Sequence, residues 1–231
     1  MPLETELKLS LRPADRDRLL AHPLLRAQPP ERLRLRNTYF DTPALALLRQ
    51  RIAVRERRVG RRTLLTVKTA GHSVAGLSRR QEWEGQTRPG AFDFAALVDD
   101  AALADTLGAL AGQLVPVFRT DFLRLRWVIA HAGAHGDARI ELALDEGTVR
   151  TDADAPHGRQ QQALLELELE LLSGPVEALF ELARALATAP PGDVLPGVRL
   201  QPSERSKAER GFDLFLGRSS PDEPARGGAS R

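Results

Sequence analysis

The 231-residue sequence contains no cysteine, which excludes both disulfide bonds and thiolate metal sites. No apolar stretch approaches the roughly 20 residues that a membrane helix needs. The segment from Met1 to Glu6 has neither the basic flank nor the apolar run of a signal peptide. We therefore expect a cytoplasmic protein without a membrane partner, and the length suits one large domain.

The sequence also lacks a surplus of either charge, because 33 basic and 31 acidic residues leave a net charge of +2. Such a balance does not indicate nucleic-acid binding. Lysine is scarce: only Lys8, Lys68 and Lys207 occur, and the other 30 basic residues are arginine. Either chance, or a need for a compact ammonium where a planar guanidinium does not fit, explains these three positions.

Alternation of apolar and polar residues at period two predicts eight strands. They lie at about residues 3–9, 32–40, 51–58, 63–69, 79–85, 117–129, 138–145 and 162–171. Helical patterns lie at residues 13–21, 92–111, 175–188 and 203–216. For the third of these, Ser173 is the expected N-cap, with Pro175 near the helix start. Clusters of glycine, proline and polar residues predict loops at 71–76, 131–137, 152–160 and 190–197.

Eight closely spaced strands in one domain predict an α+β protein that is mainly β. The expected architecture is an eight-stranded antiparallel β-barrel with peripheral helices, and an open α+β sheet is the alternative. We expect this domain to span residues 1–217. Residues 218–231 are rich in proline, glycine, serine and charge, and this composition predicts a disordered tail.

Charged residues alternate with apolar ones along almost every predicted strand. The first strand places Glu4, Glu6 and Lys8 on one face, and the strand at 165–171 places three glutamates on one face. Such a row of like charges is repulsive on an ordinary surface, and a divalent cation removes the repulsion. The charged residues that alternate with apolar ones on the other predicted strands are Arg55, Arg57, Lys68, Arg80, Glu82, Glu84, Arg124, Arg126, Glu141 and Asp145.

Two interpretations of this alternation are open. A half-buried antiparallel strand also turns polar residues toward water, and that explanation suffices for any single strand. Charges of both signs on nearly every strand favour a closed barrel with a charged lumen, which is costly unless a charged ligand fills it or the charges pair. Carboxylates bind Mg²⁺ or Mn²⁺, and arginine and lysine bind phosphate oxygens. Together they predict a metal–polyphosphate site.

Other motifs are weaker. His131 and His135 are four residues apart, but Gly133 and Gly136 argue against a helix, so we interpret both histidines as loop residues. The glycine-containing segment 71–76 is not a P-loop, because no Gly-Lys-Ser/Thr follows it. Trp83 and Trp127 alternate with charged residues and are expected to point away from the lumen.

Several short segments occur in the order of a known signature and cover about residues 3–216. The set resembles the CYTH superfamily of triphosphate tunnel metalloenzymes. The segments are Glu4-x-Glu6-x-Lys8, Tyr39-Phe40-Asp41-Thr42, Ala53-Val54-Arg55-Glu56-Arg57, Thr66-Val67-Lys68, Arg80-Gln81-Glu82-Trp83-Glu84, Leu142-Ala143-Leu144-Asp145-Glu146-Gly147, Leu165-Glu166-Leu167-Glu168-Leu169-Glu170 and Ser206-Lys207-Ala208-Glu209-Arg210-Gly211.

The resemblance implies an eight-stranded tunnel with a defined set of site residues. The implied metal ligands are Glu4, Glu6, Glu166, Glu168 and Glu170, assisted by Asp145, Glu82 and Glu84. The implied substrate-binding residues are Lys8, Arg55, Arg57, Lys68, Arg119, Arg124, Arg126 and Lys207, the last on a terminal helix that closes one end. Lys8, Lys207 and Glu4 are the expected catalytic residues. Which two of the three glutamates at 166–170 bind metal stays open, and so does which of the three arginines at 119–126 face the lumen, because a one-residue slip inverts each face.

The resemblance further implies hydrolysis of inorganic triphosphate to pyrophosphate and phosphate, dependent on Mg²⁺ or Mn²⁺. Thiamine-triphosphatase, adenylate cyclase and a non-enzymatic polyphosphate- or nucleotide-binding module are the alternatives. Aromatic residues are only 5% of the chain, and the sequence reveals no separate pocket for an organic group. The expected partner is a small-molecule triphosphate and not nucleic acid, and the expected state is a monomer or homodimer.

Overall fold

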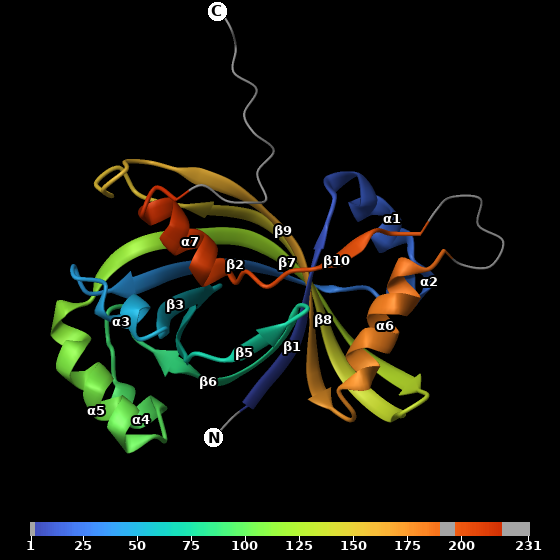
Figure 1. The fold of residues 1–231 in the computed structure, drawn as a ribbon, viewed down its shortest axis with the longest axis horizontal. Helices are drawn as coiled ribbons and strands as arrows, with labels where there is room; N and C mark the ends of the chain where they lie inside the picture. The colour runs from blue at the N-terminus through green and yellow to red at the C-terminus, as the bar shows by residue number, and fades with distance from the viewer. Residues whose placement is uncertain (1–2, 190–196, 219–231) are drawn as a thin grey trace, which may run out of the picture.

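The computed structural model describes residues 3–189 and 197–218, and its frame is a ring of eight antiparallel strands (Figure 1). Around the ring the strands are β1 (Leu3–Leu11), β9 (Gln161–Ser173), β8 (Gly136–Arg150), β7 (Val115–Gly133), β2 (Glu31–Asp41), β3 (Ala53–Val59), β4 (Arg62–Lys68) and β6 (Leu77–Thr87). Pairing of β1 with β6 closes the ring. The short strands β10 (Leu200–Pro202) and β5 (His72–Val74) pair with β1 and β6. The predicted antiparallel barrel is confirmed, and the open sheet is wrong.

Helices surround the ring on three sides (Figure 1). On one side lie η1 (Pro13–Asp15), α1 (Arg16–Ala21), α2 (Pro23–Arg26) and α6 (Glu177–Ala187). On the other lie α3 (Ala46–Arg49), α4 (Phe94–Leu97), α5 (Ala101–Leu110) and η2 (Ala111–Gln113). The last helix, α7 (Lys207–Phe215), contacts β7 and β8. No helix within the described ranges is long and apolar enough to cross a membrane.

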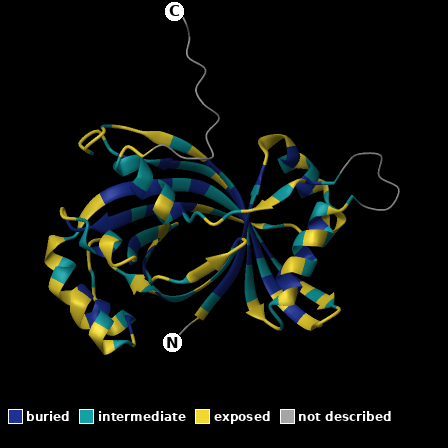
Figure 2. Cartoon of the chain, viewed as in Figure 1, coloured by how far each residue is buried: buried dark blue, intermediate teal, exposed yellow. Residues whose placement is uncertain are grey.

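The two large apolar cores lie outside the ring, between its strands and these helices. In the first, Trp127 and Leu142 of the sheet pack with Leu182 of α6. In the second, Trp83 and Val67 pack with helix residues that include Phe94 and Leu107. Burying each such side chain contributes roughly 1.5–3 kcal/mol. Figure 2 shows buried residues alternating with less buried ones along the strands, as expected when one strand face packs on a core. The inner face therefore carries the charged residues, together with a small apolar cluster of Leu35, Phe122 and Leu164.

Two predicted boundaries on the long strands differ from the structure. The expected loop at 131–137 is mostly strand, because β7 continues to Gly133 and β8 begins at Gly136, leaving a two-residue turn. Glycine at a tight hairpin turn has the same local signal as glycine in a loop. His131 therefore lies in β7, whereas His135 is a turn residue, and both contact Glu181 of α6.

The helices also differ in detail from the prediction. The expected helix at 92–111 is two helices, each with its own aspartate cap: Asp93 accepts from Ala96 N and Asp100 from Leu103 N. Ser173 is not the N-cap of α6, because it is still paired with Arg139 as the end of β9. The predicted loop at 71–76 contains the short strand β5. Most of the expected loop at 190–197, and nearly all of the expected tail, lie outside the described residues.

Candidate active site

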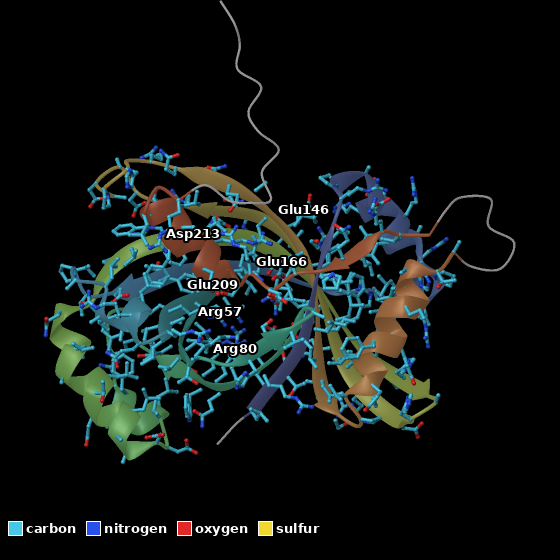
Figure 3. The ribbon with its side chains drawn as sticks, in the orientation of Figure 1. Arg57, Arg80, Glu146, Glu166, Glu209 and Asp213 are labelled. Atoms are coloured by element: carbon cyan, nitrogen blue, oxygen red, sulfur yellow. The ribbon has the colours of Figure 1, made fainter. Side chains whose placement is uncertain are left out.

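The inner face of the ring encloses a cavity of about 350 Å³, which we call the lumen. All eight strands of the ring and the start of α7 contribute to its lining. Figure 3 shows Arg57, Arg80 and Glu166 within the ring, beneath α7 in this view. The charged lining residues are Glu4, Glu6, Lys8, Arg55, Arg57, Lys68, Arg80, Glu82, Glu84, Arg124, Glu141, Glu168, Glu170 and Lys207. Strand alternation thus gathers most of the predicted site residues around one space.

On one wall of the lumen, the cations and carboxylates of β1, β4 and β6 form ion pairs between neighbouring strands. The register sets Glu4 opposite Arg80 and Lys68 opposite Glu82. Lys68 Nζ lies 2.6 Å from a Glu82 oxygen and 3.0 Å from Glu4, and Arg80 pairs with both Glu4 and Glu6 at 2.8 Å. Arg80 was not among the predicted site residues. Its position two residues before Glu82, on the same strand face, was the signal that could have identified it.

Three carboxylates at the α7 side of the lumen form the Lys207 cluster, which consists of Asp145, Glu166 and Glu168. One oxygen of each lies within 4.8 Å of the others. The Lys207 ammonium contacts all three, at 2.7 Å from Asp145 and 3.0 Å from Glu168, with a closer contact to Glu166. Arg124 adds two hydrogen bonds to Asp145 and one to Glu168, each of 2.7 Å. This cluster is therefore already supplied with positive charge.

Burial and mutual attraction shift the pKa values of the Lys207 cluster in a consistent pattern. Burial alone would lower the pKa of Lys207, but Asp145, Glu166 and Glu168 outweigh it and raise that pKa. Burial would raise the pKa of Glu168, but Lys207, Lys8 and Arg124 hold it well below the usual range. Burial raises the pKa of Glu166, whose Oε2 accepts no hydrogen bond.

The sequence of α7 fixes the place of Lys207 at the helix start. Ser206 caps the helix: its hydroxyl accepts from the Glu209 amide at 3.1 Å, and the Glu209 carboxylate accepts from the Ser206 amide at 2.7 Å. Gly211 faces the Phe118 ring of β7 so closely that any Cβ there would overlap it. Phe212 meets the same ring edge-on, at 5.2 Å between centroids. This packing holds Lys207 inside the ring.

A second group of lumen carboxylates, the Glu170 cluster, consists of Glu4, Glu82, Glu141 and Glu170. Across the strands, Glu170 of β9 is paired with Glu6 on one side and Glu141 on the other. Within residues 3–189 and 197–218, no lysine or arginine nitrogen lies within 4 Å of the Glu170 carboxylate. Burial, together with Glu4, Glu141 and Glu82, raises the pKa of Glu170 to about 7. Its other three members pair with Lys68, Arg80 or Arg126, so Glu170 is the member without a cation partner among the described residues.

Strand β3 supplies the most strongly basic part of the lumen. Arg55 reaches Glu82 and Glu84 only at 3.6 Å, and its buried Nε has no hydrogen-bond partner. Arg57 donates to Asn37 at 3.1 Å and lies 3.8 Å from Glu84. Burial, with the neighbouring Arg55 and Arg124, lowers the pKa of Arg57 to about 10. Two poorly neutralised guanidinium groups side by side favour an anionic ligand.

The register of β7 separates the three predicted arginines of that strand. Arg124 lines the lumen, as described above. Arg119 lies at an odd-numbered position on an uninterrupted strand, so it faces outward, where it pairs with Asp152 at 2.9 Å. Arg126 shares the inward row but does not line the cavity; it pairs with Glu141 at 2.7 Å and Glu31 at 2.9 Å.

A smaller cavity of about 190 Å³ adjoins the lumen. It shares Lys8, Lys68 and Arg80 with the lumen lining, and its other walls include apolar side chains such as Ile52 and Phe212. The sequence had revealed no pocket for an organic group, because these walls come from the α3–β3 connection, the segment after β4, and α7. The structure places this partly apolar cavity beside the charged lumen.

The donor chemistry of the lumen fits a divalent hard cation. All of its candidate ligands are carboxylate oxygens, the ligands that Mg²⁺ and Mn²⁺ prefer. In the Glu170 cluster, three such groups surround Glu170, which has no ion-pair partner among the described residues. Glu168 and Glu170 line the lumen, whereas Glu166 is fully enclosed.

Comparisons with known proteins point to one family. Residues 2–193 match the CYTH domain. Over 190 residues the chain is 32% identical to the inorganic triphosphatase of Haemophilus influenzae, a match that covers 80% of this chain but only 47% of that relative. The chain thus spans about half the length of the curated relative that it matches.

Solved structures of similar fold cover almost the whole chain. A candidate adenylyl cyclase of Hippeastrum, described as having a dominant triphosphatase activity, aligns with a TM-score of 0.61 and 22% identity, over 94% of this chain and 98% of its own. A candidate adenylate cyclase of Bacillus halodurans aligns with a TM-score of 0.54 and 19% identity, over 92% and 100% of the two chains. At these identities the likeness establishes the fold alone.

Proposed function

Because this chain belongs to the CYTH domain family, we propose that it hydrolyses inorganic triphosphate to pyrophosphate and phosphate inside the lumen, with Mg²⁺ or Mn²⁺. The observation that carries this proposal is the lining of the 350 Å³ lumen, where guanidinium and ammonium groups face carboxylates across one enclosed space. Cations alone would suffice to bind phosphate, so the carboxylates indicate a metal as well. The name of the Haemophilus relative agrees with this choice of substrate.

The phosphate chain would be bound by the lumen cations. Arg55 and Arg57 make only long contacts with lumen carboxylates, at 3.6–3.8 Å, and the buried Arg55 Nε is a donor without an acceptor. Lys8, Lys68, Arg80 and Arg124 pair with lumen carboxylates at 2.6–3.6 Å. When triphosphate binds, its oxygens would replace these carboxylates as partners of the cations. Each cation would stay paired, because one set of ion pairs is exchanged for another.

The same exchange would release carboxylates for a metal. Glu170 and its neighbours Glu4 and Glu82 are the residues that would hold the divalent cation, with Glu168 and Glu170 as the ligands from β9. When bound, Mg²⁺ or Mn²⁺ supplies charge neutralisation and polarises phosphate oxygens. Glu166 has a different position, because it stays enclosed by Lys207 and Arg210.

Hydrolysis then requires a water oxygen to attack the terminal phosphorus in line. The new oxygen–phosphorus bond forms as the bridging oxygen–phosphorus bond breaks, pyrophosphate leaves, and the proton of the water passes to a lumen carboxylate. The fixed guanidinium and ammonium groups stabilise the charge that develops on the transferred group. Lys207 acts from the end of the lumen, where α7 limits the access of bulk water.

The test is phosphate release from inorganic triphosphate with Mg²⁺, with Mn²⁺ and with EDTA. We expect fast release with either metal and none with EDTA. Thiamine triphosphate and ATP serve as matched substrates, since they carry the same phosphate chain with an organic substituent. Absence of release from all three would contradict hydrolysis and favour a binding protein, and formation of cyclic AMP from ATP would favour a cyclase.

The adjoining cavity supports one alternative substrate class, an organic triphosphate. Its apolar wall at Ile52 and Phe212 could accommodate a substituent while the phosphates remain beside Lys8 and Lys68. The volume of about 190 Å³ is small for a complete nucleoside, which is why inorganic triphosphate is our first choice. Filling the cavity separates the two: Ala70→Leu, at a residue that lines this cavity and not the lumen, should reduce turnover of an organic triphosphate far more than turnover of the inorganic substrate.

A further inference from the structure

A second concave surface lies on the outside of the ring, away from the lumen. It has a volume of about 610 Å³ and is lined by β2, β3, β4 and β7, with the ends of β6 and β8, the β3–β4 turn and the segment after β6. We call it the arginine groove, because seven of its lining residues are arginine and only two, Glu56 and Asp121, are acidic. The groove shares no lining residue with the lumen.

The arginine groove carries more net positive charge than the whole chain does. Its lining carries a surplus of five positive charges, whereas the whole chain carries only +2. The rest of the protein is therefore net acidic, and the positive charge is concentrated on this surface. Such a local field attracts anions even when the total charge is near neutral.

The acidic residues near the groove are already engaged. Asp121 pairs with Arg34 at 2.6 Å and with Arg36 at 3.5 Å, and Glu56 accepts from the Gly90 amide at 2.6 Å. For the other arginines, the described parts of the chain offer no carboxylate within 4 Å. These residues are Arg58, Arg61, Arg62, Arg88 and Arg150.

Strand pairing places several of these charges directly against one another. Arg36 of β2 is the register partner of Arg58 of β3, and Arg119 of β7 is the register partner of Arg150 of β8. Like charges directly opposite each other on neighbouring strands destabilise a sheet. The side chain of Arg36 is 64% exposed, so the repulsion is maintained on an accessible surface. An anion that bridges the pairs would remove it.

The lining chemistry identifies the class of anion. Besides guanidinium groups, the groove offers the hydroxyl-bearing residues Thr38, Thr63, Thr87 and Thr120, and none of the described residues that line it is aromatic. Single-stranded nucleic acid is normally bound through base stacking on aromatic side chains, which this surface cannot provide. Guanidinium forks match phosphate oxygens bidentately. We propose that the arginine groove binds linear inorganic polyphosphate, a chain with one charge per repeat and no substituent.

The arginine groove differs from the lumen in its location and in the residues that line it. Arg57 belongs to the lumen lining and Asn37 to the groove lining, and the Arg57–Asn37–Thr120 hydrogen-bond chain lies between the two spaces. The groove has no carboxylate cluster for a metal. Binding there requires no hydrolysis, so the inference does not rest on the proposed function of the lumen.

The experiment measures binding of a fluorescently labelled polyphosphate, much longer than triphosphate, to the full chain in EDTA. The groove variant is Arg36→Glu/Arg58→Glu, and the matched control is Arg26→Glu/Arg139→Glu, which makes the same charge change at exposed positions elsewhere. We expect the groove variant to lose at least about tenfold in affinity, with a shallower dependence on salt, and the control to lose much less. Turnover of triphosphate by the groove variant should stay within about twofold of wild type.

Each other outcome overturns the proposal. Equal loss in the groove variant and the control would mean that net charge alone attracts the probe. Loss in Lys8→Ala but not in the groove variant would place polyphosphate in the lumen. A DNA duplex that binds as tightly as polyphosphate, and is weakened in parallel, would identify a general phosphate-backbone surface. Failure of the wild type to bind would remove the site, whatever the lumen hydrolyses.

Discussion

The Lys207 cluster and the Glu170 cluster line the same ring, yet they are neutralised very differently. In the first, Lys207 and Arg124 lie within 3.0 Å of Asp145 and Glu168. In the second, Glu170 is surrounded by carboxylates, and no described lysine or arginine reaches it within 4 Å. The carboxylate without a cation partner, Glu170, therefore lies outside the tighter group of carboxylates.

This difference shows that close carboxylates do not by themselves make a metal site. The oxygens of Asp145, Glu166 and Glu168 have the spacing for an ion, but the Lys207 ammonium already occupies that position. The raised pKa of Glu170 reports the opposite situation, a charge that burial and neighbours leave uncompensated. Four substitutions test the comparison.

The largest effect is expected from Lys8→Ala. Lys8 is buried and contacts Glu6 at 3.3 Å and Glu168 at 3.6 Å, so it joins the Lys207 cluster to the phosphate-binding wall. Loss of one fixed cation at the developing charge should lower kcat about 10²- to 10³-fold, to be measured as phosphate release from triphosphate. Lys68→Ala is the matched comparison on the wall nearer the Glu170 cluster. Activity of Lys8→Ala equal to wild type would remove Lys8 from the site.

Removal of the cation from the first cluster should make it resemble the second. Lys207→Ala leaves three buried carboxylates around an empty position, and in EDTA we expect a loss of about 3–5 kcal/mol in the free energy of unfolding. Mg²⁺ should recover part of this loss, because the ion can take the place of the ammonium. Urea unfolding with and without Mg²⁺ measures both effects, and Lys207→Arg retains the charge as control. No response of Lys207→Ala to Mg²⁺ would show that this cluster cannot hold metal.

Removal of charge from the second cluster should stabilise the metal-free protein. The pKa of Glu170 rises from 4.5 to about 7 on folding, so ionisation opposes the folded state increasingly as pH rises through that interval. Glu170→Gln should therefore raise the free energy of unfolding by about 3 kcal/mol at about pH 8 in EDTA, and have almost no effect at about pH 4.

Urea unfolding at the two pH values measures this difference. The same variant should gain less stability from Mg²⁺ than the wild type does. If Glu170→Gln raised the free energy of unfolding equally at both pH values, the ionisation of Glu170 would not be the cause of the increase.

The smallest effect is expected from the helix that carries Lys207. Gly211→Ala would force α7 away from the Phe118 ring and should destabilise the fold by about 1–3 kcal/mol, while displacing Lys207 but not the Glu170 cluster. Gly108→Ala in α5 is the control, because a Cβ there meets no other atom and should stabilise by about 0.5–1 kcal/mol. Thermal unfolding measures both. If the two variants changed the unfolding temperature equally, α7 would not be closely packed against Phe118.

Much of this site could be predicted from period-two alternation alone. Glu4, Glu6 and Lys8 share the inner face of β1, as the sequence indicated, and Trp83 and Trp127 lie in the outer cores. The orientation of Arg119 could not be predicted, because it depends on where β7 begins and on the absence of a bulge between Arg119 and Arg124. The position of a hairpin turn is equally ambiguous, since Gly133 and Gly136 are compatible with a loop or with two long strands.

The electrostatic environment of each glutamate in the site could not be predicted from the sequence, for a different reason. Glu166, Glu168 and Glu170 form a regular row on β9, and nothing in the pattern distinguishes them. Only the folded ring sets Glu166 and Glu168 against Lys207, and Glu170 against Glu141 and Glu6. Their opposite environments arise from partners that are distant in the sequence.

The closure of the ring has a consequence for how the protein is made. The strand β1 pairs with β6 through Leu3–Leu7 and with β9 through Glu6–Ser10, so its pairing with β9 forms only after the long intervening segment has been synthesised. Such long-range pairing slows folding. Until β9 is synthesised, the edge of β1 that pairs with it stays open, and the charges of Glu6 and Lys8 on this segment keep the edge from associating with other chains. The residues proposed to bind phosphate and metal would thus first protect the nascent chain.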